Sequence, residues 1–264
     1  DMDYLPEENV LMVIQKQSSG AYELLQVDCD TGKAAGAGVD LTLEDPLMEA
    51  RFLVATHNTD VALIGYAGDA LQPIIGESKG FIPITEFEQM AHAMPSRSGF
   101  ALPRWVAPAA EGATPMFEAL LEACEMVEEW CARPENAQSY PPTIFNITDG
   151  EASDGDHADI AEISERLRSY ATADGNALLI NIHLASGESE RSVVFPQSVD
   201  ELGGNYYARL LYECASEMPA NYAPAIASLR GETVGTHYRG MCFNASAAEV
   251  VAMMNIGSIS LNVM

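Results

Sequence analysis

Residues 140–159 read YPPTIFNITDGEASDGDHAD and indicate the fold more clearly than any other part of the chain. Behind two prolines, the run Thr143–Thr148 has the length and the β-branched content of a buried strand. A strand that ends in a carboxylate-rich loop, with a helix next, is the usual place for a ligand site in an open α/β sheet. The acidic residues of this loop are Asp149, Glu151, Asp154, Asp156 and Asp159.

A helix is predicted directly after this loop, because apolar residues recur there at helical spacing. Asp156, His157 and Asp159 are the candidates for its N-cap, where a side chain accepts hydrogen bonds from the first backbone amides. The apolar positions of the predicted helix are Ile160, Ile163, Leu167 and Tyr170.

Strands and helices alternate along the rest of the chain. Residues 10–14 and 22–28 are predicted to form a hairpin, and residues 88–110 an irregular surface connection. Pro219 and Pro224 are expected to interrupt the segment that follows the helix at residues 206–214. Further strands are predicted at residues 61–66, 177–185, 192–195 and 239–244, and further helices at residues 43–54, after Pro115 and after the capping box Ser246–Glu249.

This alternation predicts an α/β fold, with a doubly wound, mostly parallel central sheet and helices on both faces. The 264 residues fit one large domain, and we expect a single domain over residues 1–264. The five cysteines include no C-x-x-C pair, which favours reduced and mostly buried thiols.

The composition narrows the classes of partner. Asp and Glu number 39 against 13 Lys and Arg, so nonspecific attraction to nucleic acid or to an anionic membrane is not expected. No stretch reaches the roughly 18 to 20 continuous apolar residues of a membrane helix. We therefore expect a soluble, cytoplasmic protein whose acidic surface suits a cation or a basic protein surface.

The carboxylates around Asp149 support three interpretations. They form a solvated loop with turn and cap chemistry, or a site for a divalent cation, or a catalytic site for metal-assisted hydrolysis. The catalytic interpretation uses Asp149 with Asp154 or Asp156, yet the histidines are scattered and no H-E-x-x-H, Gly-x-Ser-x-Gly or Walker-type motif occurs. His183, inside a predicted core strand, is expected to be buried and hydrogen-bonded.

A second segment, Gly112–Met116, marks the start of a predicted amphipathic helix. Thr114 is predicted to be its N-cap and Pro115 its first helical residue, where the missing N–H costs nothing. The apolar residues that follow recur at helical spacing, with glutamates on the other side: Phe117, Leu120, Leu121, Cys124, Val127 and Cys131.

Together, Gly112–Met116, the acidic amphipathic helix and Ile144–Asp156 resemble the von Willebrand factor type A domain, specifically the bacterial stand-alone type. The segments Ala173–Leu179, Tyr238–Gly240 and Phe243–Ala245 look like the same group, and the resemblance covers roughly residues 61–257. It is poorest over residues 1–50, which hold the first strand and the possible hairpin.

The resemblance implies a doubly wound, Rossmann-like fold with a metal-ion-dependent adhesion site at the carboxyl-terminal edge of the sheet. Such a site takes an Asp-x-Ser-x-Ser motif, a Thr and an Asp, which places Ser19, Thr114 and Asp149 as metal ligands. It binds Mg²⁺ or Mn²⁺, and an acidic side chain of a partner completes the coordination. This chain departs from the first motif: Gln15-Lys16-Gln17-Ser18-Ser19 keeps only Ser19, which makes the site degenerate.

Two hypotheses follow. The first is a non-enzymatic protein-interaction module, and the resemblance connects such modules with bacterial signalling or stress response. It expects a protein partner, no organic cofactor, no nucleic acid and no membrane. The alternative is a metal-dependent hydrolase or phosphoryl-transfer enzyme that uses the Asp149 loop.

Overall fold

The computed structural model describes residues 60–68, 70–73, 80–84, 86, 92–95, 101–104, 112–148, 151–184 and 192–257, and the backbone of four strands between residues 2 and 41. The chain divides into two compact units: residues 1–61 with 82–90, and residues 62–81 with 91–264. This division by contacts does not by itself set domain boundaries, so the single domain over residues 1–264 stays a prediction. The predicted helix at residues 43–54 lies outside the described residues.

The first unit contains an antiparallel sheet in the order β1-β2-β3-β4. The predicted hairpin is confirmed, because β2 pairs with β3 from Val10↔Asp28 to Lys16↔Tyr22. The strand partners of β2 are thus β1 and β3. The resemblance implied instead that this strand belongs to the parallel sheet. The strands are β1 (Met2–Leu5), β2 (Val10–Lys16), β3 (Tyr22–Asp28) and β4 (Val39–Leu41), with β5 (Asp60–Val61) paired to β8 (Ile82–Pro83).

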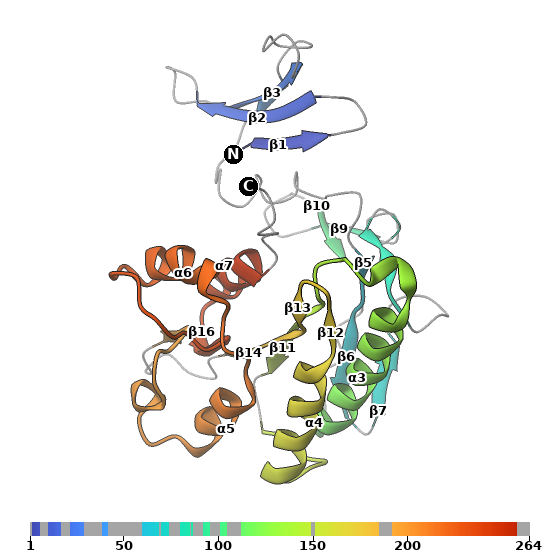
Figure 1. Ribbon diagram of the computed structural model, residues 1–264, viewed down its shortest axis with the longest axis vertical. Coiled ribbons are helices and arrows are strands. Elements are labelled where there is room, and N and C mark those ends of the chain that lie inside the picture. The colour runs from blue at the N-terminus through green and yellow to red at the C-terminus, as the bar shows by residue number, and fades with distance from the viewer. Residues whose placement is uncertain are drawn as a thin grey trace. The chain divides into compact units, whose positions relative to one another are not determined.

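The second unit is built on a four-stranded, mostly parallel sheet in the order β11-β14-β16-β15 (Figure 1). β14 lies between β11 and β16 and is parallel to both, whereas the edge strand β15 is antiparallel to β16. This arrangement confirms the α/β class. The strands are β11 (Thr143–Thr148), β14 (Leu178–Leu184), β15 (Val193–Val194) and β16 (Met241–Ala245).

Helices pack against both faces of this sheet. Leu179 of β14 belongs to a core with α3, α4 and α5, while its neighbours Ile180 and Ile182 belong to a second core with α6 and α7. Alternate side chains of a strand point to opposite faces, so a strand covered on both sides is apolar throughout. Figure 1 shows α3 and α4 side by side. The helices are α3 (Met116–Ala132), α4 (His157–Ser169), α5 (Tyr206–Cys214), α6 (Ala223–Arg230) and α7 (Ala247–Gly257).

Short elements complete the second unit, and two of them correct the sequence interpretation. A hairpin of β9 (His92–Pro95) and β10 (Ala101–Arg104) lies where an irregular connection was expected. Pro224 does not interrupt the chain but stands in the first turn of α6, where proline is well tolerated. The others are β6 (Ile64–Ala67) with β7 (Ala70–Pro73), β12 (Ala171–Thr172) with β13 (Gly175–Asn176), and the 3-10 turns η2 (Pro134–Asn136), η3 (Val199–Leu202) and η4 (Ala220–Tyr222).

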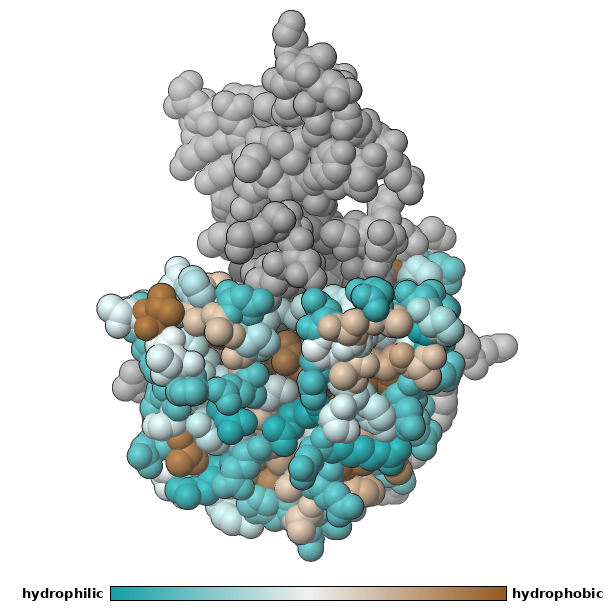
Figure 2. Space-filling view, viewed as in Figure 1, coloured by the Kyte–Doolittle hydropathy of each residue, from teal (hydrophilic) through white to brown (hydrophobic). Residues whose placement is uncertain are grey.

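The coloured residues in Figure 2 form a largely hydrophilic face on which hydrophobic residues occur in small separate groups. Among the described residues, no helix combines the length and the hydropathy needed to cross a bilayer. The described cysteines are all free thiols, which confirms the prediction for them: Cys124, Cys131, Cys214 and Cys242.

Candidate functional site

The candidate site lies where β11 ends and α3 and α4 begin. Of the three residues that the sequence predicts as metal ligands, Thr114 is described, whereas Ser19 and Asp149 lie outside the described residues. The geometry therefore concerns Thr114 and the rest of the loop after Asp149, residues 151–156.

Two backbone-based hydrogen bonds join Thr114 to this loop. The Ser153 N–H donates to the Thr114 carbonyl oxygen at 3.0 Å, and the Thr114 N–H donates to Ser153 Oγ at 2.9 Å. Ser153 thus holds the segment before α3 against the loop that follows Asp149. The structure brings together two of the three chain segments that the sequence predicts for the site.

The N-terminus of α3 differs from the prediction. Pro115, and not Thr114, occupies the N-cap position, and no side chain of that residue caps the helix. Asp154 of the facing loop does so instead: Oδ1 accepts from the Phe117 N–H at 3.0 Å and Oδ2 from the Glu118 N–H at 2.9 Å. A carboxylate is favourable there because the helix dipole and the unpaired amides attract negative charge.

The N-terminus of α4 agrees with the prediction. Asp156 is the N-cap and accepts from the Ala158 N–H at 2.8 Å and the Asp159 N–H at 3.0 Å, while Asp159 accepts from the Asp156 N–H at 2.8 Å. The hydrogen bonds from the Asp159 and Ala158 backbone lower the pKa of Asp156. Three of the five acidic residues, Asp154, Asp156 and Asp159, therefore accept hydrogen bonds from backbone amides at the start of a helix.

The turn between β6 and β7 supports the same segment from another side. The Gly68 N–H donates to the Ala113 carbonyl oxygen at 2.9 Å. Gly112 has φ of 101°, and a Cβ there would lie 2.9 Å from the Gly68 Cα, so the close approach of the two backbones requires glycine. The position of Thr114 is fixed by hydrogen bonds on both sides.

A buried polar network lies beneath this edge. The Tyr66 hydroxyl donates to Asn146 Oδ1 at 2.7 Å and to the Ile147 carbonyl oxygen at 3.0 Å. Asn146 donates to Asn181 Oδ1 at 2.9 Å, and Asn181 donates to the Leu211 carbonyl oxygen at 2.9 Å. The network links β6, β11, β14 and α5, and no sequence pattern indicates which partners these polar residues find.

The two histidines near this edge contact other side chains of the protein: His157 through polar contacts and His183 through ring stacking. His157 begins α4, and its Nδ1 lies 2.5 Å from the Tyr206 hydroxyl oxygen while its Nε2 lies 3.4 Å from Glu213. His183 stacks on Phe243 with ring centroids 4.6 Å apart, and Tyr207 meets it edge-on at 5.9 Å. His183 is half-buried between aromatic rings rather than fully buried as predicted.

Sequence reasoning identified Thr114 and the Asp149 loop but not the residues that join them. Asp154 was expected to act in a solvated loop, a cation site or a catalytic pair, and Ser153 had no predicted role, because a one-dimensional pattern does not show which helix a loop side chain faces. Within the described ranges, no three His, Cys, Asp or Glu side chains gather into a metal-ligating group. The arrangement offers hydroxyl and carboxylate oxygens beside a sheet edge, which suits hard cations and polar contacts.

Comparisons of this chain with protein-family models, with curated proteins and with solved structures give no match.

Proposed function

We propose that this chain is a protein-interaction module with a doubly wound, von Willebrand factor type A-like fold. It binds its partner at the carboxyl-terminal edge of the sheet, where Thr114 and Asp149 would hold Mg²⁺ or Mn²⁺. The bound ion would present an open coordination position to an acidic side chain of the partner. Bacterial signalling or stress response is the setting that the resemblance suggests.

One observation carries the proposal: Ser153 ties Thr114 to the loop after Asp149 through hydrogen bonds of 2.9 and 3.0 Å. This contact joins the segment of Thr114 to the loop that follows Asp149, although Asp149 comes 35 positions after Thr114 in the sequence. The Thr114 side chain does not cap α3, which leaves its hydroxyl for another role.

The environment of the remaining acids favours binding over hydrolysis. The hydrolase alternative uses Asp149 with Asp154 or Asp156, but both of these carboxylates accept hydrogen bonds from helix N-terminal amides. The backbone hydrogen bonds lower the pKa of Asp156, which makes it a weaker general base, and Asp154 is occupied in capping α3.

The test is a titration with Mg²⁺, Mn²⁺ and Ca²⁺, followed by thermal and urea unfolding, on the wild type, Asp149→Ala and Thr114→Val. An ion at a hundred times its dissociation constant raises the free energy of unfolding by about 2.7 kcal/mol. We expect this gain with Mg²⁺ or Mn²⁺ in the wild type, a smaller gain in Thr114→Val and little gain in Asp149→Ala.

The matched control is Asp200→Ala, which removes one exposed carboxylate from η3, away from the loop edge. This control keeps the general effect of divalent ions on an acidic protein and should retain the full gain of the wild type. If no ion stabilises the wild type more than Asp149→Ala, the metal-dependent mode of binding is wrong.

A further inference from the structure

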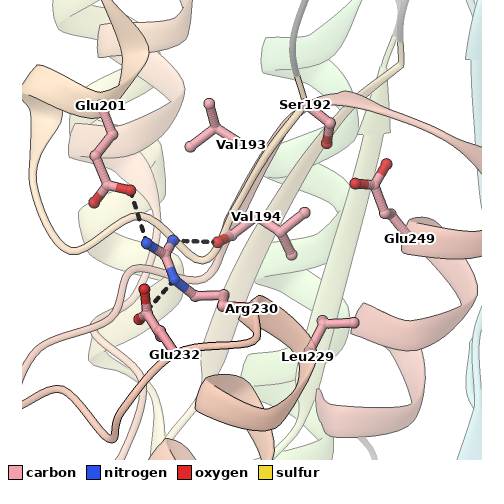
Figure 3. A pocket seen from close by; sticks show the side chains of 8 residues that line it. All are labelled: Ser192, Val193, Val194, Glu201, Leu229, Arg230, Glu232 and Glu249. Atoms are coloured by element: carbon pink, nitrogen blue, oxygen red, sulfur yellow. Dashed lines mark hydrogen bonds and ion pairs between the residues drawn. The ribbon is translucent and has the colours of Figure 1, made fainter.

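A cavity of about 380 Å³ lies beside β15, the edge strand of the sheet (Figure 3). Val193 and Val194 of the strand and Leu229 of α6 give it an apolar wall, and Leu229 is 36% exposed there. Figure 3 shows Glu201 and Glu232 on one side of the cavity and Glu249 on the other. The cavity is therefore apolar along its middle and charged at its two sides.

Arg230, the one base among the described residues that line the cavity, is already engaged by the protein. Its Nε donates to Glu232 and its Nη2 to Glu201, each at 2.8 Å. Its Nη1 donates to the carbonyl oxygens of Val194 at 2.6 Å and Phe195 at 3.0 Å. A guanidinium has five N–H donors, so Arg230 has little capacity left to bind an anion.

Glu249, across the cavity, has no basic partner among the described residues. Its Oε2 accepts from the N–H and the hydroxyl of Ser246, each at 2.7 Å. Burial acts to raise the pKa of Glu249, but hydrogen bonding with Ser246 and Ser192 together outweighs burial and the pKa is lowered. Glu249 is therefore ionised at neutral pH.

The charges of the lining do not balance. Among the described residues that line the cavity, three carboxylates face one guanidinium, which gives these residues together a formal charge of −2. The carboxylates do not converge on one point, since no metal-ligating group of three occurs within the described ranges. The complementary ligand is thus an extended dication with an apolar middle, and not a single metal ion.

We propose that this cavity binds a linear alkyl diamine. One ammonium group donates to Glu249, the methylene chain lies on Val194 and Leu229, and the second ammonium group donates to Glu201 or Glu232. Each charge at the ends of the ligand meets a carboxylate, and the apolar chain leaves water against an apolar wall. This proposal is independent of the function proposed for the loop edge.

The experiment titrates the full chain with 1,4-diaminobutane, n-butylamine and 1,4-butanediol in a buffer that contains EDTA, and follows binding by calorimetry and amide NMR shifts. We expect saturable 1:1 binding of the diamine, about tenfold weaker binding of the monoamine, and no binding of the diol. The affected amides should belong to β15, the end of α6 and the start of α7.

Two variants locate the site. Glu249→Gln keeps the capping box of α7, because Gln serves at that position as Glu does, and should weaken diamine binding to the level of the monoamine. Leu229→Ala should weaken both amines. The matched control, Glu162→Gln, removes an exposed carboxylate of α4 and should leave binding unchanged.

Any acidic protein attracts diamines weakly, so the control is decisive. The proposal is overturned if Glu162→Gln weakens binding as much as Glu249→Gln does, if the titration does not saturate, or if the diol shifts the same amides as strongly as the diamine.

Discussion

Asp154 and Asp156 are two positions apart in one loop, yet each serves a different helix. Asp156 caps the helix that follows it in sequence, and this role was predictable because an N-cap is local. Asp154 caps α3, whose N-terminus is 36 or more positions away in the sequence, and no local pattern indicates such a partner. The tertiary contact that positions the candidate site therefore became visible only in the structure.

The cap at Asp156 makes stability depend on pH. Hydrogen bonds from the backbone of Asp159 and Ala158 lower the pKa of Asp156 in the folded state. A lowered pKa stabilises the folded state at pH values above the pKa of the unfolded state, which is about 3.9 for aspartate. This stabilisation is lost as the pH falls through the pKa of the folded state. Asp156→Asn keeps a good N-cap that does not titrate. We expect the wild type to lose more stability than this variant between about pH 5 and pH 2.

The measurement is urea unfolding at several pH values, with the difference between wild type and Asp156→Asn plotted against pH. Glu165→Gln, an exposed change on the same helix, is the control and should follow the wild type. If the difference in the free energy of unfolding stays constant over this pH range, the charge of Asp156 does not contribute to stability.

Local patterns predicted the elements of the second unit better than their partners. The strand at residues 143–148 and the helix at 206–214 agree with the structure at both ends, because their periodicity and breakers are local. The hairpin of β9 and β10 was missed because Pro95 and Pro103 argued against strands, yet a two-stranded ribbon has open edges where a missing N–H costs little. The strand at residues 10–14 was predicted to pair in a hairpin, and this is confirmed, whereas the resemblance implied a place for it in the parallel sheet, because a strand pattern alone does not specify its neighbour.

The hydrogen-bonded pair Asn146–Asn181 is the contact between these elements that should be most sensitive to mutation. Both side chains are nearly fully buried, and they connect β11, β14 and α5. Asn181→Leu leaves the Asn146 N–H and the Leu211 carbonyl oxygen without this partner, and an unpaired buried polar group costs about 1–3 kcal/mol. We expect a loss of about 3 kcal/mol in the free energy of unfolding, measured in urea.

A double-mutant cycle separates pairing from packing. Asn146→Leu and Asn181→Leu each leave one group of the other amide without its partner in the Asn146–Asn181 hydrogen bond, whereas the double variant removes both groups. The double variant should therefore lose clearly less stability than the sum of the two single variants. Strict additivity would mean that the two amides do not interact, contrary to the 2.9 Å hydrogen bond.

At the scale of the whole molecule, the net charge of −26 opposes the compact state. The basic residues offset it only locally: Arg133 pairs with Glu129 and Arg166 with Glu128, both at the surface. Such exposed pairs are worth about 0–1 kcal/mol each. Repulsion among 39 acids should outweigh the attraction of the few pairs, and both are weakened by salt.

We therefore expect monovalent salt to stabilise this protein. Raising NaCl from about 0.02 to 0.5 M shortens the Debye length to below 10 Å and screens the net repulsion more than it weakens the few ion pairs. The unfolding temperature should rise by a few degrees, since 1 kcal/mol corresponds to about 2–4 °C in a chain of this size.

KCl should act like NaCl, because screening depends on ionic strength and not on the ion. A fall in unfolding temperature would mean that the ion pairs, and not the surplus of acids, dominate the electrostatic energy. Mg²⁺ at matched ionic strength should add a further rise only where a specific site binds it, and Asp149→Ala should then remove that rise while keeping the response to NaCl.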